Sequence, residues 1–156
     1  MPRLLFSRPL MSAIVGLSLV AGHGTDVEAR RAGWASPMSG LQEHGDTIDV
    51  SDEHGGSVGQ YDGMWASYAA AGKKVRVVGP CQSACTTLLG HIPRDRICVM
   101  PEASFGFHRA RTQYGTETMW TGYPADIKAW IKGQGGLTAE FKWMSAPDTY
   151  RFFKRC

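Results

Sequence analysis

The stretch Gly79-Pro80-Cys81-Gln82-Ser83-Ala84-Cys85-Thr86-Thr87 decides the fold that this sequence predicts. It follows a β-branched run, Lys74-Val75-Arg76-Val77-Val78, and it leads into an apolar segment that ends at Gly90. A strand, a tight corner of Gly and Pro, and a helix in this order expose one side chain at the corner, and that side chain is Ser83. A serine in this position can be a nucleophile if a histidine reaches it and backbone N–H groups face the same point.

The sequence offers candidates for both requirements. His108 lies 25 residues after Ser83, at the end of Ser104-Phe105-Gly106-Phe107, and is our choice for the general base. Gly55 and Gly56 lie 28 and 27 residues before Ser83, where their backbone, with the Ala84 N–H, would form an oxyanion hole. Three other histidines compete with His108, and the one beside Gly55 would line the same cleft; they are His44, His54 and His91.

Length and composition indicate one globular domain. The chain has 156 residues, of which 43% are hydrophobic and 20% are charged. A net charge of +3, with Lys and Arg scattered along the chain, does not favour nucleic acid as a partner. We also expect no metal and no cofactor, because no second cluster has the spacing of zinc ligands.

The first residues have the pattern of a secretory signal. Arg3 and Arg8 precede an uncharged apolar run from Leu10 to Ala21, which has the length of a signal-peptide core and is short for a membrane helix. We therefore expect a signal peptide at residues 1–29, or alternatively an uncleaved membrane anchor, then a linker at 30–45 and the folded domain at 46–156. Either alternative predicts a periplasmic or secreted domain, which contacts a membrane only through an uncleaved leader.

Four cysteines in an exported chain predict disulfides, and three pairings are open. Cys81 and Cys85 flank Ser83, which indicates either a disulfide that stiffens the corner or a thiol site. A bond between Cys98 and Cys156 would close the C-terminus onto the sheet.

Periodicity in the remaining chain predicts alternating strands and helices. We expect strands at residues 47–51, 74–78, 97–100 and 104–107. We expect helices at residues 58–71, 84–90 and 124–132. A helix joins the first two strands, so we expect those strands to be parallel. Residues 109–122 are polar and rich in Gly and Thr, which predicts a loop, and 139–144 and 147–153 predict short helical or irregular pieces.

Four of these segments resemble, in order, the Clp-type serine peptidases of the ClpP/crotonase superfamily. They are Val50 to Val58 at the family's glycine turn, Cys81 to Cys85 at its nucleophile, Arg96 to Pro101 at a strand ending in proline, and Phe105 to His108 at its histidine. The leader and the Cys-x-Ser-Ala-Cys-Thr form are similar to exported ClpP-like proteins of bacteria. The resemblance implies a reduced α/β fold of stacked ββα units with a short parallel sheet.

Beyond His108 the resemblance thins to residues 143–148, Trp-Met-Ser-Ala-Pro-Asp, which are similar to the run beside the family's catalytic aspartate. Phe141 occupies the position of that aspartate. The acid of a triad would then be Glu140, with Asp148 and Asp126 as alternatives. The family's N-terminal strands and oligomerising handle are short or missing, so its barrel assembly and ATPase partner are not implied, while a homo-oligomer stays open.

These observations predict a secreted or periplasmic serine hydrolase, peptidase-like, acting on a peptide or small acyl substrate. The alternative is a catalytically degenerate ClpP-like fold that serves as a binding module, which the missing aspartate favours. Acyl-CoA chemistry of the crotonase type is weaker, because export removes the chain from the CoA pool. Arg109 and Arg111, beside His108, either hold a substrate carboxylate or form a solvated pair at a strand end.

Overall fold

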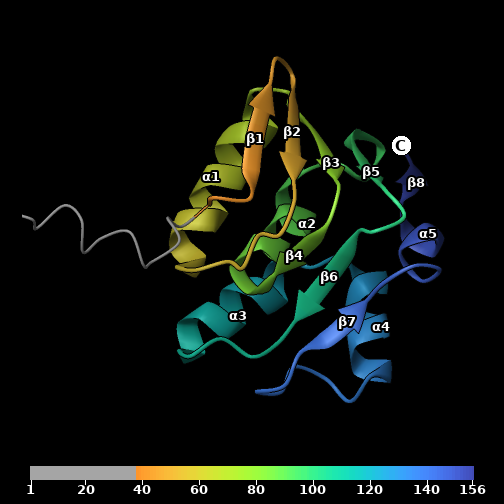
Figure 1. Cartoon of the computed structure of the whole chain (residues 1–156). Helices are drawn as coiled ribbons and strands as arrows, with labels where there is room; N and C mark the ends of the chain where they lie inside the picture. Colours follow the sequence, from red (N-terminus) through yellow and green to blue (C-terminus); the bar gives the residue numbers. More distant parts are fainter. Residues whose placement is uncertain (1–37) are drawn as a thin grey trace, which may run out of the picture. The chain divides into compact units, whose positions relative to one another are not determined.

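Two β-sheets carry the fold of residues 38–156, the part of the chain that this computed structural model describes (Figure 1). The larger sheet has the strand order β1 (Leu41–His44), β2 (Thr47–Val50), β3 (Lys74–Val77), β5 (Ile97–Val99) and β8 (Lys154–Arg155). The smaller sheet has the order β4 (Pro80–Gln82), β6 (Ser104–Phe107) and β7 (Lys142–Met144). Parallel and antiparallel pairs both occur, so the fold is mixed α/β.

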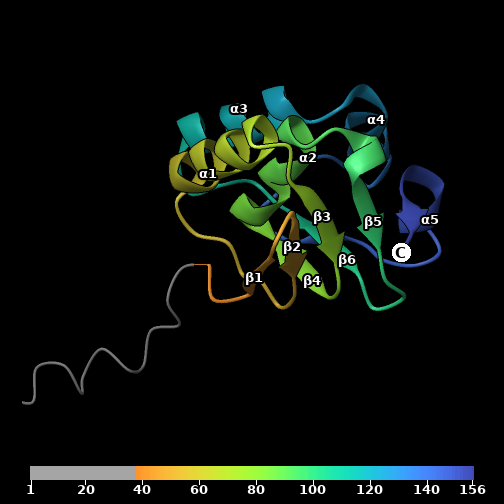
Figure 2. The same ribbon diagram turned by 90° about the horizontal axis from the view of Figure 1, so that it is seen from above.

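Residues 38–156 also contain α-helices. They are α1 (Val58–Ala70), α2 (Leu88–His91), α3 (Gln113–Gly122), α4 (Ala125–Gly133) and α5 (Thr149–Phe152), with 3₁₀ turns η2 (Ser83–Thr87) and η3 (Arg94–Arg96). Figure 2 shows α1 to α4 on the same side of the strand layer. The core between these layers is apolar and includes the fully buried Trp65, Tyr61 and Leu88.

Local sequence explains the unit β2–α1–β3 well. In β2, Ile48 and Val50 are fully buried and alternate with half-buried residues, as a strand with one covered face requires. Helix α1 ends at Gly72, whose φ of +74° suits glycine, and the Gly72 and Lys73 N–H groups donate to the carbonyls of Ala69 and Tyr68. This is a Schellman cap. Strands β2 and β3 are parallel, which confirms the prediction.

Four predictions of local structure differ from the observed elements. The expected linker contains β1, which pairs antiparallel with β2 across a turn at Gly45. The expected loop at 109–122 contains helix α3, and the segment 139–144 contains β7, which pairs with β6. The helix predicted at 84–90 begins instead as the 3₁₀ turn η2 and becomes α-helical only at Leu88.

The predicted signal peptide at residues 1–29, and the first part of the predicted linker, lie outside the described residues. Within residues 38–156, no helix is long and apolar enough to cross a membrane.

The cysteines form two disulfides, which decides among the three pairings. Cys81 is bonded to Cys85, with their Cα atoms 5.4 Å apart. Cys98 is bonded to Cys156, with a Cα separation of 5.0 Å, and so ties β5 to the last residue of the chain. All four cysteines of the sequence are therefore in disulfides.

Candidate active site

Ser83 lies at the corner between β4 and η2, and its backbone has an unusual conformation. Its φ is +54°, in the left-handed region that non-glycine residues rarely occupy. The turn that follows holds this conformation, since Thr86 Oγ1 donates to the Ser83 carbonyl and residues 84 to 87 are buried. Backbone strain of this kind concentrates at functional sites, where surrounding structure keeps it in place.

The parallel pairing of β4 and β6 brings His108 to Ser83. Gln82 lies opposite Gly106, so the residues that follow the two strands leave the smaller sheet at the same edge. The His108 Nε2 and Ser83 Oγ atoms are 2.7 Å apart, a hydrogen-bond distance. The two side chains that the sequence predicted to meet do meet.

Burial lowers the pKa of His108 below its ordinary value of 6.5. The neutral imidazole therefore predominates at pH 7. In the tautomer with its proton on Nδ1, Nε2 accepts the hydrogen bond from the Ser83 hydroxyl. That is the protonation state a general base needs before reaction.

The ring of Phe141 packs against the imidazole. The two ring centroids are 4.3 Å apart, and Phe141 stacks in turn on Trp143 at 5.4 Å. The absence of a side chain at Gly106 makes room for this pair, because a Cβ there would lie 2.9 Å from the Trp143 ring and 3.0 Å from Phe141. Both aromatic rings are partly exposed, at 37% for Phe141 and 44% for Trp143.

The three carboxylates considered as the triad acid have other surroundings. Asp126 forms a bidentate pair with Arg94. Asp148 accepts from Trp130 Nε1, with Arg151 3.4 Å away, and the Glu140 side chain is 87% exposed. Within residues 38–156, none of these three hydrogen-bonds to His108, so the structure does not bring the predicted acids to the site.

Gly55 lies directly against the serine corner. Its φ is +77°, and a Cβ at this position would be 2.6 Å from the Gln82 carbonyl oxygen and 2.9 Å from the Ala84 nitrogen. Only glycine fits such an approach of two backbones. However, the Gly55 N–H donates to the Glu53 carboxylate at 3.2 Å, so this group, which the sequence suggested for the oxyanion hole, is already occupied.

Within residues 38–156, the N–H groups of Gly56 and Ala84 are both unpaired, but Gly56 is exposed whereas Ala84 is fully buried against Gly55. Ala84 is in the first turn of η2, where backbone N–H groups have no partner within the helix. Among the described residues, neither N–H donates to a protein acceptor. The two residues flank the point where Gly55 meets the corner, so both are candidates to bind an oxyanion.

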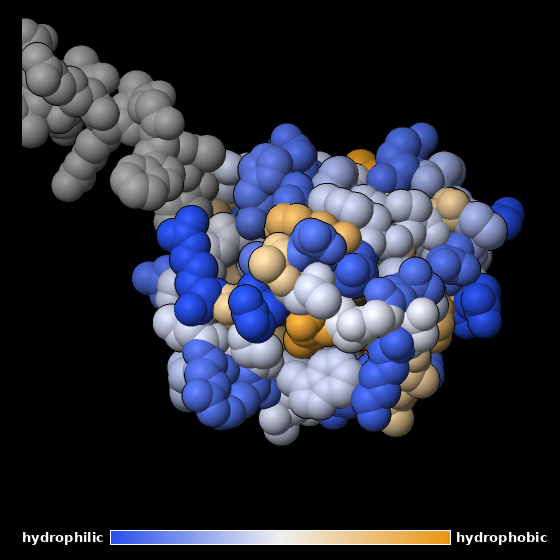
Figure 3. Space-filling model, turned by 90° about the horizontal axis from the view of Figure 1, so that it is seen from below, coloured by the Kyte–Doolittle hydropathy of each residue, from blue (hydrophilic) through white to orange (hydrophobic). Residues whose placement is uncertain are grey.

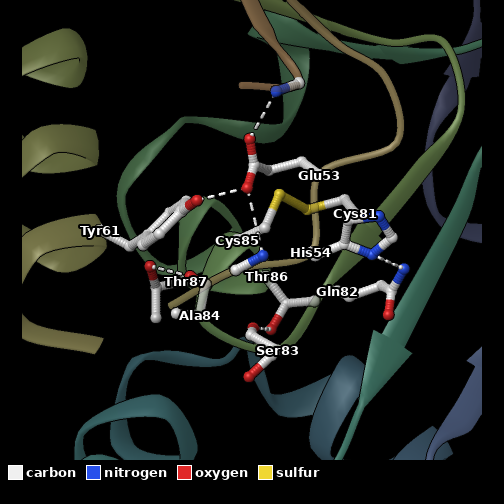
Figure 4. The surroundings of a disulfide bond; sticks show 12 residues. Glu53, His54, Tyr61, Cys81, Gln82, Ser83, Ala84, Cys85, Thr86 and Thr87 are labelled. Atoms are coloured by element: carbon white, nitrogen blue, oxygen red, sulfur yellow. Dashed lines mark hydrogen bonds between the residues drawn. A yellow bond between two sulfur atoms is a disulfide. The ribbon is translucent and has the colours of Figure 1, made fainter. Parts of the chain in front are cut away.

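Glu53 is a site residue that sequence reasoning missed. It is only 2% exposed, and its carboxylate accepts hydrogen bonds from the Gly40 N–H at 2.9 Å, from the Gly55 N–H and from the Tyr61 hydroxyl (Figure 4). Burial, and then this bond to Glu53, raise the pKa of Tyr61, so Tyr61 stays a donor. The sequence feature that could have identified it is an acidic residue two positions before the glycine pair.

Backbone hydrogen bonds fix the Glu53 segment beside β4. The Glu53 N–H donates to the Pro80 carbonyl at 2.8 Å, and the Gln82 N–H donates to the Glu53 carbonyl at the same distance. The buried disulfide between Cys81 and Cys85 links the residues on either side of Ser83 in the sequence, and it lies next to Glu53 (Figure 4). The bridge and the Glu53 segment both adjoin the serine corner.

The competing histidines have partners elsewhere. His54 Nδ1 is 2.9 Å from the Gln82 amide nitrogen, and the side chain is 62% exposed. His91 is 2.7 Å from Asp62, and His44 is 3.9 Å from Asp49. None of the three contacts Ser83 by a hydrogen bond. Among residues 38–156, no group of three or more His, Cys, Asp or Glu side chains is arranged to hold a metal ion.

Comparison with known proteins gives likenesses in structure alone. No family model matches the sequence, and no curated protein matches it. Among solved structures, the chain is similar to the ClpP1 N165D mutant from Listeria monocytogenes, with 16% identity and a TM-score of 0.44 over 70% of this chain and 71% of that one. It is also similar to a peptidase from Plasmodium falciparum, with 10% identity and a TM-score of 0.39 over 61% of this chain. This match spans 59% of the Plasmodium chain, which is less than two thirds of its length.

Proposed function

We propose that this protein is a serine hydrolase with a reduced ClpP-like fold that cleaves peptide or small acyl substrates. The observation that carries the proposal is the 2.7 Å contact between His108 Nε2 and Ser83 Oγ, at a corner where Ser83 is held at positive φ. A serine needs an adjacent base to become a nucleophile at neutral pH, and His108 is that base.

In the proposed reaction, Ser83 Oγ attacks the substrate carbonyl while its proton passes to His108 Nε2. The carbonyl oxygen becomes an oxyanion that accepts from the Gly56 and Ala84 N–H groups, each worth about 3 kcal/mol of barrier in comparable sites. His108 then gives the proton to the leaving group, and the acyl group stays on Ser83. A water molecule repeats the sequence as nucleophile and releases the acid.

This site would work as a Ser–His dyad. Phe141 packs against His108 in the position where the family resemblance suggested an acid. A carboxylate orients the histidine and stabilises its protonated form, so we expect catalysis below that of a full triad. The packed ring still limits the rotation of the imidazole.

The same observation favours a second candidate function. A hydrophobic ring in place of the acid suits a protein that has kept the fold as a binding module and lost turnover. In that case the aromatic pair Phe141 and Trp143, which is partly exposed next to His108, would contact the ligand.

We also infer that the domain functions in the periplasm or outside the cell. Two disulfides use every cysteine of the chain, and such bonds persist in oxidising compartments. The leader predicted at residues 1–29 is consistent with this location.

Labelling with a fluorophosphonate probe tests the proposal. We expect the purified protein to be labelled, and we expect Ser83→Ala and His108→Ala to abolish labelling. Matched controls are Ser67→Ala, an exposed serine on α1, and His44→Ala, an exposed histidine on β1; both should label like the parent.

Labelling that persists in Ser83→Ala would show that another residue reacts and would overturn the assignment. No labelling of a parent protein that circular dichroism shows to be folded would favour the binding module.

A further inference from the structure

A pocket opens directly beside His108. Its volume is about 760 Å³, and it is formed by the segment after β6 and the first turns of α3. The side chains that give it its character are His108, Arg109, Arg111, Thr112, Gln113 and Glu117. The space-filling view from below, the side on which Figure 1 places α3 and β7, shows mainly hydrophilic residues with small hydrophobic areas between them (Figure 3).

Arg109 and Arg111 differ from every other arginine in residues 38–156. Three of the others pair with carboxylates, one donates to a backbone carbonyl and one lies over an aromatic ring; they are Arg76, Arg94, Arg151, Arg96 and Arg155. Within the same described residues, neither guanidinium in the pocket has a carboxylate, hydrogen-bond or ring partner. The pocket therefore contains two guanidinium groups whose N–H donors are not used by other side chains or by the backbone of these residues.

The charged groups that line the pocket leave it with a net positive charge, because they are two arginines and a single carboxylate. Glu117 is the one carboxylate among the lining residues, and it accepts a hydrogen bond from the Gln113 amide at 2.7 Å. The pocket also faces the start of α3, which Thr112 caps by accepting from the Gly115 N–H at 3.0 Å. A helix start carries a partial positive charge, which adds to that of the arginines.

A backbone hydrogen bond fixes the position of the Arg109 main chain. The Arg109 N–H donates to the Thr138 carbonyl at 2.6 Å, so the residue after His108 is anchored to the segment before β7. Planar guanidinium groups bind carboxylates through paired hydrogen bonds, so a carboxylate of a peptide substrate would match their free donors.

We propose that Arg109 and Arg111 bind a carboxylate of the substrate, so that the hydrolase prefers acyl substrates with a negative charge close to the reacting carbonyl. The inference rests on the proposed function, because it takes Ser83 and His108 as the reacting groups. The carboxylate has two sources in peptides, an acidic side chain and a free C-terminus.

A binding experiment tests this independently of turnover. It uses the Ser83→Ala protein and three ligands followed by chemical-shift titration: acetyl-Ala-Glu-amide, acetyl-Ala-Gln-amide, and acetyl-Ala-Gln with a free C-terminal carboxylate. We expect at least one of the two anionic peptides to bind about tenfold more tightly than the neutral one at low salt. The anionic peptide that binds more tightly identifies the source.

Arg109→Gln/Arg111→Gln should remove this preference, so that the anionic and neutral peptides bind this variant with similar affinity. The matched control, Arg151→Gln/Arg155→Gln, removes the same charge from α5 and β8 and should keep it. Equal affinities for all three peptides, or an equal loss in both double variants, would overturn the proposal. Because Ser83 is absent from the titrated protein, failure of labelling and failure of this preference are separate results.

Discussion

The imidazole of His108 has a polar neighbour at one nitrogen and an aromatic neighbour at its face. Nε2 contacts Ser83 Oγ, and the ring of Phe141 covers part of the imidazole. Burial is the cause of its lowered pKa, since a positive charge on the ring would lose hydration without gaining a partner. Its basicity is therefore set by burial, in contrast to a triad, where a carboxylate raises it.

The pH dependence of labelling should report this directly. Labelling needs neutral His108, so its rate should reach a plateau at high pH and fall as the pH drops through a midpoint below 6.5, the lowered pKa of the folded protein. The measurement is the rate of fluorophosphonate labelling from pH 4.5 to 8. A midpoint above 6.5 would contradict the dominance of burial.

Replacing the packed ring by an acid should reverse the shift. In Phe141→Asp, a carboxylate near the imidazole would favour its charged form and move the midpoint of the labelling profile upwards by about one pH unit or more. Phe141→Ala is the control, since it removes the ring without adding charge. Identical midpoints in the two variants would mean that position 141 does not face the imidazole.

Among the elements, the segment around Glu53 joins parts of the chain that are distant in sequence. Its carboxylate accepts from Gly40 before β1, from Gly55 at the serine corner and from Tyr61 on α1. A buried carboxylate that satisfies three donors cannot be removed without leaving those donors unpaired. The position of the glycine turn therefore depends on an acid that itself touches no reacting atom.

We expect Glu53→Ala to lower the free energy of unfolding by about 3 kcal/mol, since buried donors lose their acceptor. Tyr61→Phe removes one of the three bonds and should cost about 1 kcal/mol. Urea unfolding followed by circular dichroism measures both. Similar small losses in the two variants would show that water replaces the carboxylate.

The serine–histidine pair and the β2–α1–β3 unit were predictable because local signals and topology agree there. A corner after one strand, a histidine after another and a parallel arrangement of the two strands suffice to bring Ser83 and His108 together. Helix α3 was not predictable in this way, because two glycines and three threonines within Gln113–Gly122 give it low intrinsic helix propensity. Tertiary packing of Met119 and Gly115, which are buried, stabilises it instead.

The prediction of the triad acid failed for a different reason. The family pattern placed it after His108, and the chain has several carboxylates there, but sequence spacing does not say which way each one points. Asp126 is paired with Arg94, and Glu140 projects into solvent. The function of Glu53 was equally hidden, because its three donors come from segments up to 13 residues away.

At the scale of the whole molecule, the two disulfides differ in what they hold together. Cys98–Cys156 closes a loop with a sequence separation of 58 and ties the C-terminus to the larger sheet. Cys81–Cys85 closes a loop with a sequence separation of only 4, and Ser83 lies in the middle of that loop. Loop-closure entropy grows with loop length, so the long bridge should contribute about 4 kcal/mol of stability and the short one about 2 kcal/mol.

Paired substitutions should separate the effects of the two disulfides. Cys98→Ala/Cys156→Ala should give the larger loss of unfolding free energy and keep the labelling rate of Ser83. Cys81→Ala/Cys85→Ala should lose less stability. It should slow labelling at least tenfold, because the disulfide no longer holds Ser83 in its positive-φ conformation. Equal effects of the two double variants on labelling would count against a role of the short bridge in the site.

The contact between Gly55 and residues 82–84 has a consequence for how such sequences diverge. Two backbone segments touch with no room for a methyl group between them, although 27 positions separate Gly55 from Gln82. A substitution at 55 therefore cannot be accommodated by its immediate neighbours and requires the serine corner to move. We therefore expect related sequences to change these two segments only together. Glycine at position 55 should be kept wherever the serine corner is kept, even in proteins that have lost the catalytic serine.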